Sequence, residues 1–466
     1  MKPKLFLGLD LGFKHRSHNP SKSERKKRKG FKQKTPGQRR ILDFKTAFLR
    51  SKMLSKRRLL PAAAVILMLL ILALCLLGLR MDTEEQILQC CASPAKTPKY
   101  QYAKEVRQVV FAKVHKAASS TIQNILLRFA MSRNLSLLLP VEGTLFSEWT
   151  SQISPENVLP HPTGETMFDM LTVHVLYNQS EMDKYFPKSA FRVAIVRDPL
   201  QHAVSALAYY STVWPYTDLT AGLRKHRADP VTGLLMHPED FSGIRGGCPE
   251  LGSWVANRMS YDLGVLDHSS SAHRLRHDYK ALRDFVDSLH KQFNLVLIAD
   301  FFDESIVLLR RRLGWSMKDI LYLTVNALPD DQNSVWRKQP DLTPDQLTPF
   351  KQCNKIDYEV FDHFLNLFFD IIGGEAYFQQ EVDAFRAVQQ KVKKFCKHGL
   401  KKTLVIPAGA WNEKFVVKRC DCLVMEAEEL HLVQAAKRKQ LRLYEAFKAF
   451  NKSDSTLKAF NKKNST

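Results

Sequence analysis

The sequence predicts an α/β domain whose central, mainly parallel sheet is flanked by helices, with a transmembrane helix ahead of it. Between about residues 105 and 395, short apolar runs alternate with segments that repeat apolar residues at helical spacing. Such alternation is typical of parallel strands joined by helices that cover both faces of the sheet. Two of the apolar runs lead through a polar turn directly into a helix, and an uncharged stretch of 21 residues precedes the whole region.

Strands are expected where the apolar runs are short, and helices where apolar residues recur every three or four positions. The predicted strands cover 106–114, 170–176, 191–197 and 294–299, and the predicted helices cover 119–132, 199–211, 304–313, 355–371 and 376–395. Beyond residue 396 the chain becomes basic and amphipathic, and the stretch AEELHLVQAAKRKQLRLYEAFKAF predicts one more helix. The repeat KAFNK, at 448–452 and 458–462, is of low complexity and is expected to lie outside regular structure.

The net charge of +23 is concentrated near the N-terminus. Residues 1–58 hold 20 lysines and arginines against three acidic residues, most densely in the run RKKRKG at 25–30. On its own, such a run is compatible with a nuclear signal. The remaining 408 residues have a net charge of only about +6, so we do not expect the domain to bind nucleic acid.

The uncharged stretch, LLPAAAVILMLLILALCLLGL at residues 59–79, is long enough to cross about 30 Å of hydrocarbon as a helix. A cleavable signal peptide has a shorter apolar core close to the N-terminus, so this segment is predicted to be an uncleaved signal-anchor. Lys56, Arg57 and Arg58 precede it, whereas acidic residues follow it after Arg80. The positive-inside rule then predicts a single-pass type II protein with a cytosolic N-terminus and a lumenal body.

Two further patterns agree with a lumenal body. Seven cysteines lie outside the predicted span, and in an oxidising compartment some of them should pair, leaving at least one free or intermolecular. Cys396 is expected to pair with Cys420 or Cys422, which bracket one C-terminal segment; spacing leaves the choice open. Sequons for glycosylation occur at Asn134, Asn178, Asn451 and Asn464.

The polar turn KVHKAASST, residues 113–121, joins the first predicted strand to its helix. A strand, a tight turn and a helix N-terminus commonly hold phosphate, because the first N–H groups of the helix are unpaired. The turn has no glycine, so it is not the triphosphate loop G-x-x-x-x-G-K-[ST]. It does supply two lysines, a histidine and three hydroxyls. The alternative is an ordinary helix start, in which a hydroxyl caps the helix and the lysines face water.

A second strand, turn and helix are predicted in FRVAIVRDPLQHAVSALAYY, residues 191–210. The strand ends in Arg197, at the sheet edge where open α/β sheets bind ligands, and Pro199 suits a first helical turn. With Ser205 about two turns further on, Arg197 could grip a second phosphate. The alternative for Arg197 is a salt bridge to Asp198 or another neighbour. Two anion-binding positions at strand ends indicate a ligand with two separated phosphate groups.

These stretches resemble a known family. FAKVHKAASSTIQNILLRFA is similar to the 5′-phosphosulfate loop of the Golgi galactose 3-O-sulfotransferases, which include galactosylceramide sulfotransferase, and VAIVRDPLQHAVSALAYY is similar to their 3′-phosphate motif. The resemblance continues through residues 294–327 and covers roughly 105–395. It implies a P-loop-like sulfotransferase fold, a Golgi type II membrane protein, and 3′-phosphoadenosine 5′-phosphosulfate (PAPS) as the sulfuryl donor.

The resemblance also implies roles for individual residues. The 5′-phosphosulfate would be bound by Lys113, His115, Lys116, Ser119, Ser120 and Thr121, and the 3′-phosphate by Arg197 and Ser205. The usual K-T-H-K-T of the family has Val114 and Ala117 here in place of its threonines, and Ala206 stands where relatives often have a second serine. These departures remove hydroxyls but none of the charges. No metal is expected, because no zinc-type Cys/His spacing occurs.

Transfer of a sulfuryl group needs a base for the acceptor hydroxyl and a cation for the leaving phosphate. Lys116 is expected to neutralise the charge that develops on the bridging oxygen. His174 is the expected general base, because the resemblance places a histidine there; without it, a structural histidine would be favoured. His115 is the alternative base or a support for Lys116. Residues 257–264 are weaker candidates for acceptor contacts, and Trp214, Tyr216 and Trp254 would either stack on a sugar or pack internally.

We therefore predict a Golgi enzyme that moves a sulfuryl group from PAPS to the 3-hydroxyl of a β-galactose on a glycolipid or glycoprotein. The alternatives are another Golgi carbohydrate sulfotransferase, for example one acting on a uronic acid, and a non-catalytic lumenal glycan-binding protein. A homodimer is compatible with the sequence, which does not decide the point. The expected division is a basic tail (1–58), the span (59–79), a stem (80–104), the sulfotransferase domain (105–395) and a C-terminal helical extension with a low-complexity tail (396–466).

Overall fold

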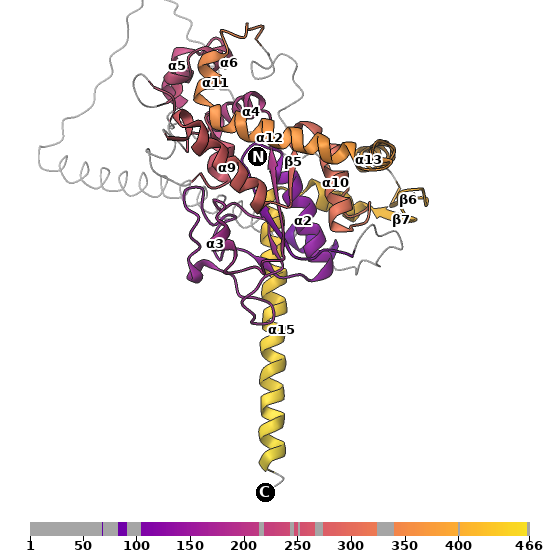
Figure 1. Cartoon of the computed structure of the whole chain (residues 1–466). Coiled ribbons are helices and arrows are strands. Elements are labelled where there is room, and N and C mark those ends of the chain that lie inside the picture. The colour runs from indigo at the N-terminus through magenta and orange to yellow at the C-terminus, as the bar shows by residue number, and fades with distance from the viewer. Residues whose placement is uncertain are drawn as a thin grey trace, which may run out of the picture. The chain divides into compact units, whose positions relative to one another are not determined.

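The computed structural model of this chain describes residues 83–90, 104–213, 219–242, 247–249, 252–265, 274–323, 340–398 and 401–463, together with Met68 (Figure 1). Among these residues, no helix combines the length and the apolar character needed to cross a membrane. The span predicted at 59–79 lies outside them, apart from Met68. The basic tail predicted at 1–58 also lies outside them.

A parallel sheet of five strands forms the centre of the domain, in the order β2-β3-β1-β4-β5. The strands are β1 (Val109–Ala112), β2 (Leu137–Leu138), β3 (Met170–Leu171), β4 (Phe191–Val196) and β5 (Leu295–Ile298). In register, Val109 lies beside Phe191, and Val193 beside Leu295. Every residue of β1 and β5 is buried, as expected for parallel strands that are covered on both faces. The predicted parallel sheet flanked by helices is confirmed.

The main helices begin where the sequence predicted them. Helix α2 (Ser119–Arg133) follows β1, α4 (Pro199–Val213) follows β4, and α10 (Phe302–Leu313) follows β5. They are followed by α12 (Lys355–Gly373) and α13 (Phe378–His398), and both α10 and α12 contact β5 (Figure 1). Helices α2, α4 and α10 start on the same edge of the sheet, because each follows the carboxyl end of a parallel strand. That edge brings the two predicted anion-binding stretches together.

Several shorter elements had no counterpart in the prediction. They are η1 (Pro155–Asn157), α3 (Gln179–Met182), α5 (Leu219–Lys225), α6 (Pro230–Met236), η2 (Pro238–Phe241), α7 (Arg258–Asp262), α9 (Tyr279–Gln292), η3 (Ala299–Phe301), α11 (Thr348–Cys353) and the antiparallel hairpin β6 (Thr403–Ile406) and β7 (Phe415–Lys418). Most have fewer than eight residues, too few for a helical periodicity to stand out in the sequence. The strand predicted at 170–176 is also shorter than expected, because only Met170 and Leu171 pair with a neighbour.

The C-terminal segment packs against the domain through α14 (Arg419–Glu426) and α15 (Glu429–Lys463). The Asn124 amide on α2 donates to the carbonyl of Val424, 2.9 Å away. Gln440 of α15 exchanges two hydrogen bonds with the backbone of Leu137, so that it covers an otherwise unpaired edge of β2. Helix α15 continues through both KAFNK copies, so the expectation of irregular structure there is wrong.

Residues 83–90, inside the predicted stem, form a helix that joins this packing. Ile87 and Leu88 belong to the main hydrophobic core, and Cys90 forms a disulfide with Cys420. This stretch is therefore ordered against the domain instead of being a plain spacer. The predicted domain boundaries otherwise stay predictions.

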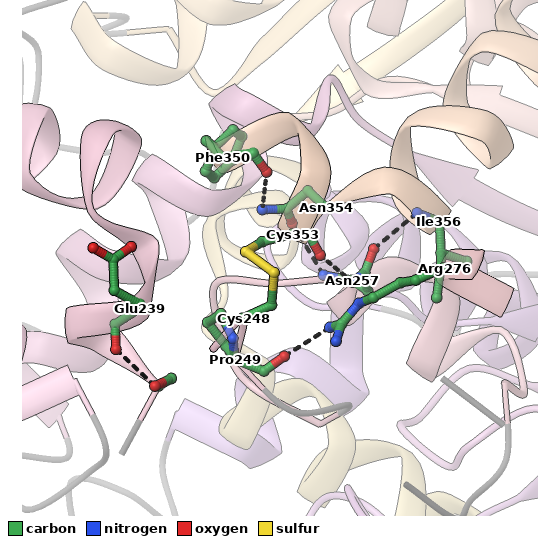
Figure 2. The surroundings of a disulfide bond; sticks show 10 residues. Glu239, Cys248, Pro249, Asn257, Arg276, Phe350, Cys353, Asn354 and Ile356 are labelled. Carbon is green, nitrogen blue, oxygen red and sulfur yellow. Dashed lines mark hydrogen bonds between the residues drawn. A yellow bond between two sulfur atoms is a disulfide. The ribbon is translucent and has the colours of Figure 1, made fainter. Parts of the chain in front are cut away.

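Two other disulfides cross-link the domain. Cys396 pairs with Cys422, which confirms one of the two pairings expected for Cys396. Cys248 pairs with Cys353; this pairing was not predicted, because a separation of 105 residues leaves no local signal. Figure 2 shows this disulfide beside Asn257, whose side-chain amide donates to the carbonyl of Cys353 at 2.6 Å. Asn257 also accepts hydrogen bonds from the backbone at the start of α12, at Ile356 and Asp357.

Candidate active site

The turn after β1 reaches a phosphate-loop shape without glycine. Lys116 and Ala118 both have left-handed backbone conformations, with φ of 54° and 58°. Such a conformation costs a non-glycine residue about 1–2 kcal/mol, so the surrounding structure must hold the turn in place. The Ser119 hydroxyl contributes by donating to the carbonyl of Val114 across the turn, at 2.5 Å.

No side-chain hydroxyl caps α2, because the N-cap position is taken by Ala118. The interpretation of the turn as an ordinary hydroxyl-capped helix start is therefore wrong. The first N–H groups of α2 lie beside a loop that is held in an unusual conformation. This is the arrangement in which a helix N-terminus can bind an anion.

Lys113, expected in the anion cradle, points into the protein interior. Its side chain is fully buried and donates to Gln123 at 2.7 Å and to Glu429 at 2.5 Å. Burial lowers the pKa of Lys113, whereas the carboxylate of Glu429 opposes that shift. Its ammonium is therefore already paired inside the domain.

Glu429 connects the loop to the C-terminal helix. It is the first residue of α15, and its second carboxylate oxygen accepts a hydrogen bond from the hydroxyl of Ser120 at 3.2 Å. Burial alone would raise the pKa of Glu429, but Lys113 and Ser120 lower it. Thr121, the last of the three predicted hydroxyls, is buried, and its backbone N–H donates to Ala118. Among the hydroxyls of Ser119, Ser120 and Thr121, that of Ser120 therefore links the turn to the C-terminal helix.

Lys116 and Arg197 lie together at the ends of neighbouring strands. The Arg197 guanidinium donates to the carbonyl of Lys116 at 3.1 Å, and the Lys116 ammonium lies 3.9 Å from the ring centre of Tyr209. Neither forms an ion pair with a carboxylate in the part of the chain that the structure describes, so the salt bridge considered for Arg197 is not formed. Burial, and then the charge of Arg197, lowers the pKa of Lys116 to about 8.

Ser205 lies half-buried in α4, which begins at Pro199 as predicted. The same helix holds His202, which was not among the predicted site residues. Its Nε2 donates to the carbonyl of His115 at 2.9 Å, and burial lowers the pKa of His202 to about 3. This neutral histidine therefore holds the loop from the side of α4. A histidine one turn into the helix after Arg197 is the only signal that the sequence offered for it.

His115 is fixed by Asp262 of α7. Both the backbone N–H and Nδ1 of His115 lie 2.8 Å from one Asp262 oxygen, and Arg258 donates to the other at 3.0 Å. Burial would raise the pKa of Asp262, but Arg258 and His115 lower it to about 2. Arg258 and Asp262 are four residues apart on one helix. They lie within the stretch 257–264, which was a weaker candidate for contacts with the acceptor.

His174 lies directly against this pair. Its ring stacks on that of His115 with centroids 3.8 Å apart, and its Nδ1 donates to the carbonyl of Lys113 at 2.9 Å. Because Nδ1 carries the proton, Nε2 keeps its lone pair. Burial, followed by the electrostatic effects of His115, Lys113 and Arg258, holds the pKa of His174 well below its usual value. A neutral imidazole with a free Nε2 lone pair is the form that a general base requires.

The remaining predicted residues lie in varied surroundings. Trp254 is buried and stacks on Tyr210 with centroids 3.9 Å apart, in agreement with internal packing. Trp214 and Tyr216 lie outside the described residues. Of the sequons, Asn134 and Asn451 are exposed, Asn178 caps α3 by accepting from the N–H of Glu181, and Asn464 lies outside the described residues.

His237, Glu239 and Asp240 are close enough together to share a cation, within 4.8 Å of one another. They lie at the exposed start of η2, and Asp240 already pairs with Lys225 and His226. The group contains none of the residues predicted for transfer.

Comparison with known proteins agrees with the sequence resemblance. A family model described as Galactose-3-O-sulfotransferase matches residues 44–411. Galactose-3-O-sulfotransferase 2 of Mus musculus is 29% identical over 62% of this chain and 70% of its own length. Galactose-3-O-sulfotransferase 3 of Homo sapiens is 28% identical over 62% and 63%, and galactosylceramide sulfotransferase of Homo sapiens is 27% identical over 63% and 64%. The match therefore spans about two thirds of these relatives, and the family model ends before α14 and α15.

Proposed function

Because this chain belongs to the galactose-3-O-sulfotransferase family, we propose that it transfers a sulfuryl group from PAPS to the 3-hydroxyl of a β-galactose. The expected enzyme class, a sulfotransferase, is confirmed with the family. The donor, the position on the sugar and the acceptor, a galactose-terminated glycolipid or glycoprotein glycan, belong to the proposal. The relatives' printed names, which include galactosylceramide sulfotransferase, support the choice of galactose.

The proposal is carried by the position of Lys116 and Arg197, two cations that lie side by side. They come from the ends of adjacent parallel strands, are partly desolvated, and form no ion pair among the described residues, although Asp300 and Asp198 act on Arg197 from beyond ion-pair distance. Desolvated cations without carboxylate partners are costly unless an anion binds between or beside them. A donor with a 5′-phosphosulfate near Lys116 and a 3′-phosphate near Arg197 and Ser205 meets that requirement.

In the proposed reaction the acceptor hydroxyl loses its proton to Nε2 of His174 while its oxygen bonds to sulfur. The bond from sulfur to the bridging oxygen breaks, and 3′-phosphoadenosine 5′-phosphate leaves with the electron pair. Lys116 stabilises the negative charge that grows on that oxygen, an electrostatic effect worth about 10²- to 10³-fold in rate. His115, held by Asp262, positions the ring of His174 by stacking.

We further propose a Golgi membrane protein of type II topology with its catalytic domain in the lumen. The uncharged segment at 59–79 and the basic residues before it support the topology. Three disulfides in the domain support folding in an oxidising compartment. Protease protection and glycosidase sensitivity of the full chain in microsomes test this. A body that is cleaved by added protease in intact vesicles would contradict it.

The function is tested with the detergent-solubilised full chain, radiolabelled PAPS and a panel of acceptors. We expect label on β-galactosides, including galactosylceramide, and none on a uronic-acid polymer. Label on the uronic-acid polymer and none on the β-galactosides would replace galactose by a uronic acid as the acceptor, and the protein would still be a sulfotransferase. If 3′-phosphoadenosine 5′-phosphate failed to raise the melting temperature, donor binding itself would be excluded, and a non-catalytic glycan-binding role would remain.

A further inference from the structure

An exposed tryptophan lies beside the candidate base. Trp149, in the loop before η1, is 56% exposed although it is the largest type of apolar side chain. Its ring meets Trp254 edge-on, with centroids 5.4 Å apart, and Tyr261 at 6.4 Å. Trp254 in turn lies 5.4 Å from His115, the ring on which His174 stacks. A continuous row of rings therefore leads from solvent to the histidine pair.

The neighbouring residue, Glu148, brings a carboxylate to the same place. One Glu148 oxygen lies 3.4 Å from Nε2 of His115, and its side chain is 24% exposed. The His115 Nε2 atom is buried and makes no hydrogen bond to any residue that the structure describes. A buried ring nitrogen without a hydrogen bond is uncommon in folded proteins, and here it lies next to a carboxylate that solvent can reach. Both atoms could be satisfied by hydroxyl groups of a ligand.

The loop that carries these two residues is held in position by Arg258. Its guanidinium donates to the carbonyl of Glu148 at 3.2 Å and lies 4.1 Å from the ring of Trp254 and 5.2 Å from that of Trp149. Arg258 is fully buried and follows Asn257, which is tied to Cys353 beside the disulfide in Figure 2. The exposed tryptophan and carboxylate therefore stand on a rigid support.

Gly252 makes room for the tryptophan. It has a φ of +92°, and a Cβ added there would lie 3.4 Å from Trp149. Arg258 also donates to the carbonyl of Gly252, at 3.2 Å. The ring of Trp149 thus rests on a backbone segment whose positive φ would strain any residue with a side chain.

The charge of this region argues for a neutral ligand. Glu148 and Asp262 are its carboxylates, and Asp262 is ionised and already engaged by His115 and Arg258. Arg258 has its own donors committed to Asp262, Gly252 and Glu148. An anionic sugar would meet the Glu148 carboxylate, while the donors of Arg258, the buried cation beside it, are already committed. A neutral hexose has an apolar face for an aromatic ring and hydroxyl groups for the polar atoms.

We propose that Trp149, Glu148 and Nε2 of His115 form the acceptor subsite, which binds a neutral hexose and disfavours a uronic acid. The hexose lays its apolar face on Trp149, one of its hydroxyls donates to Glu148, and another forms a hydrogen bond with Nε2 of His115. Because the rings of His115 and His174 lie 3.8 Å apart, a hexose held at His115 also has a hydroxyl close to the base. The role of this subsite as an acceptor site rests on the proposed sulfuryl transfer, but its binding of sugar can be tested without transfer.

The first test measures binding of lactose to the full chain by saturation-transfer NMR, and transfer by the Michaelis constant for lactose. Trp149→Ala should raise both the dissociation constant and the Michaelis constant for lactose about tenfold or more, and Trp149→Phe should restore most of the loss. The dissociation constant for 3′-phosphoadenosine 5′-phosphate should stay within about twofold. Tyr279→Ala, on α9, is the matched control because Tyr279 is also 56% exposed.

The second test exchanges the charge. The preference for methyl β-galactoside over methyl β-glucuronide is measured as the ratio of their dissociation constants. Glu148→Gln should narrow this preference about fivefold or more. Glu142 is an exposed carboxylate of the same loop, and Glu142→Gln should leave the preference unchanged. Lactose binding that is unaffected in Trp149→Ala, or an unchanged preference in Glu148→Gln, would overturn the subsite. Wild-type chain that binds lactose but transfers nothing to it would instead overturn the proposed function and leave the subsite standing.

Discussion

Lys116 and His115 are neighbours in the chain, but they belong to regions of opposite character. Lys116 lies in what we term the donor region, with Arg197 and the ring of Tyr209. His115 lies in the acceptor region, which also contains His174, Asp262, Glu148 and Trp149. The donor region holds cations without carboxylate partners among the described residues. The acceptor region holds carboxylates, the buried Arg258 that pairs with one of them, and hydrogen-bonded histidines.

This difference shows how one short turn can serve two unlike ligands. The left-handed residues Lys116 and Ala118 reverse the chain sharply, so that consecutive side chains point to different surroundings. In the proposed function, the desolvated cations attract a doubly phosphorylated donor, and the carboxylates disfavour an anionic acceptor beside the base. Single substitutions can remove one side of this contrast at a time.

The largest effect is expected for the base. His174→Ala should lower the turnover number by about 10²- to 10⁴-fold, because the acceptor hydroxyl would lose the base that takes its proton. Affinity for 3′-phosphoadenosine 5′-phosphate, measured by calorimetry, should be unchanged. A near-normal rate in this variant would show that His174 is not the base, and His115 would take its place.

A slightly smaller loss is expected for Lys116→Ala, about 10²- to 10³-fold in turnover number. The reason is the loss of the cation nearest the leaving oxygen. Single-turnover kinetics at saturating PAPS separates this effect from weaker binding. Lys280→Ala, a solvent-exposed lysine on α9, is the control and should behave as wild type.

Arg197→Ala should act on binding more than on chemistry. Loss of a charged contact to phosphate corresponds to about 10- to 100-fold weaker binding of 3′-phosphoadenosine 5′-phosphate, with turnover number changed by no more than about threefold. Comparison with adenosine 5′-phosphosulfate, which lacks the 3′-phosphate, locates the contact. If both donors were weakened equally by the substitution, Arg197 would not bind the 3′-phosphate.

The smallest effect is expected from pH. Lys116 has a pKa of about 8, so it is cationic below pH 8 and loses its charge as the pH rises through 8. Binding of 3′-phosphoadenosine 5′-phosphate should therefore be nearly constant from pH 6.5 to 7.5 and weaken above 8. Lys116→Arg should remove this alkaline decline, because arginine stays protonated. An alkaline decline that persists in the arginine variant would assign it to another group.

The ends of the strands were predictable, whereas most partners of the site residues were not. Apolar runs that lead into a polar turn and a helix located β1 with Lys116 and β4 with Arg197 within a few residues. The left-handed conformation of Ala118 left no trace, because only glycine would have marked it in the sequence. Asp262, which holds His115, and Glu429, which holds Lys113, lie 147 and 316 residues away. Contacts over such separations follow from tertiary packing and have no local signal.

The contact between Lys113 and Glu429 has a consequence for biosynthesis. A ribosome that makes about 5–20 residues per second needs roughly 15–60 seconds to cover the 316 residues between them. Throughout that interval the lysine beside the donor turn has no counterion, and the turn lacks the helix that contacts Ser120. The nascent enzyme is therefore expected to gain its ability to retain donor only when translation is nearly complete.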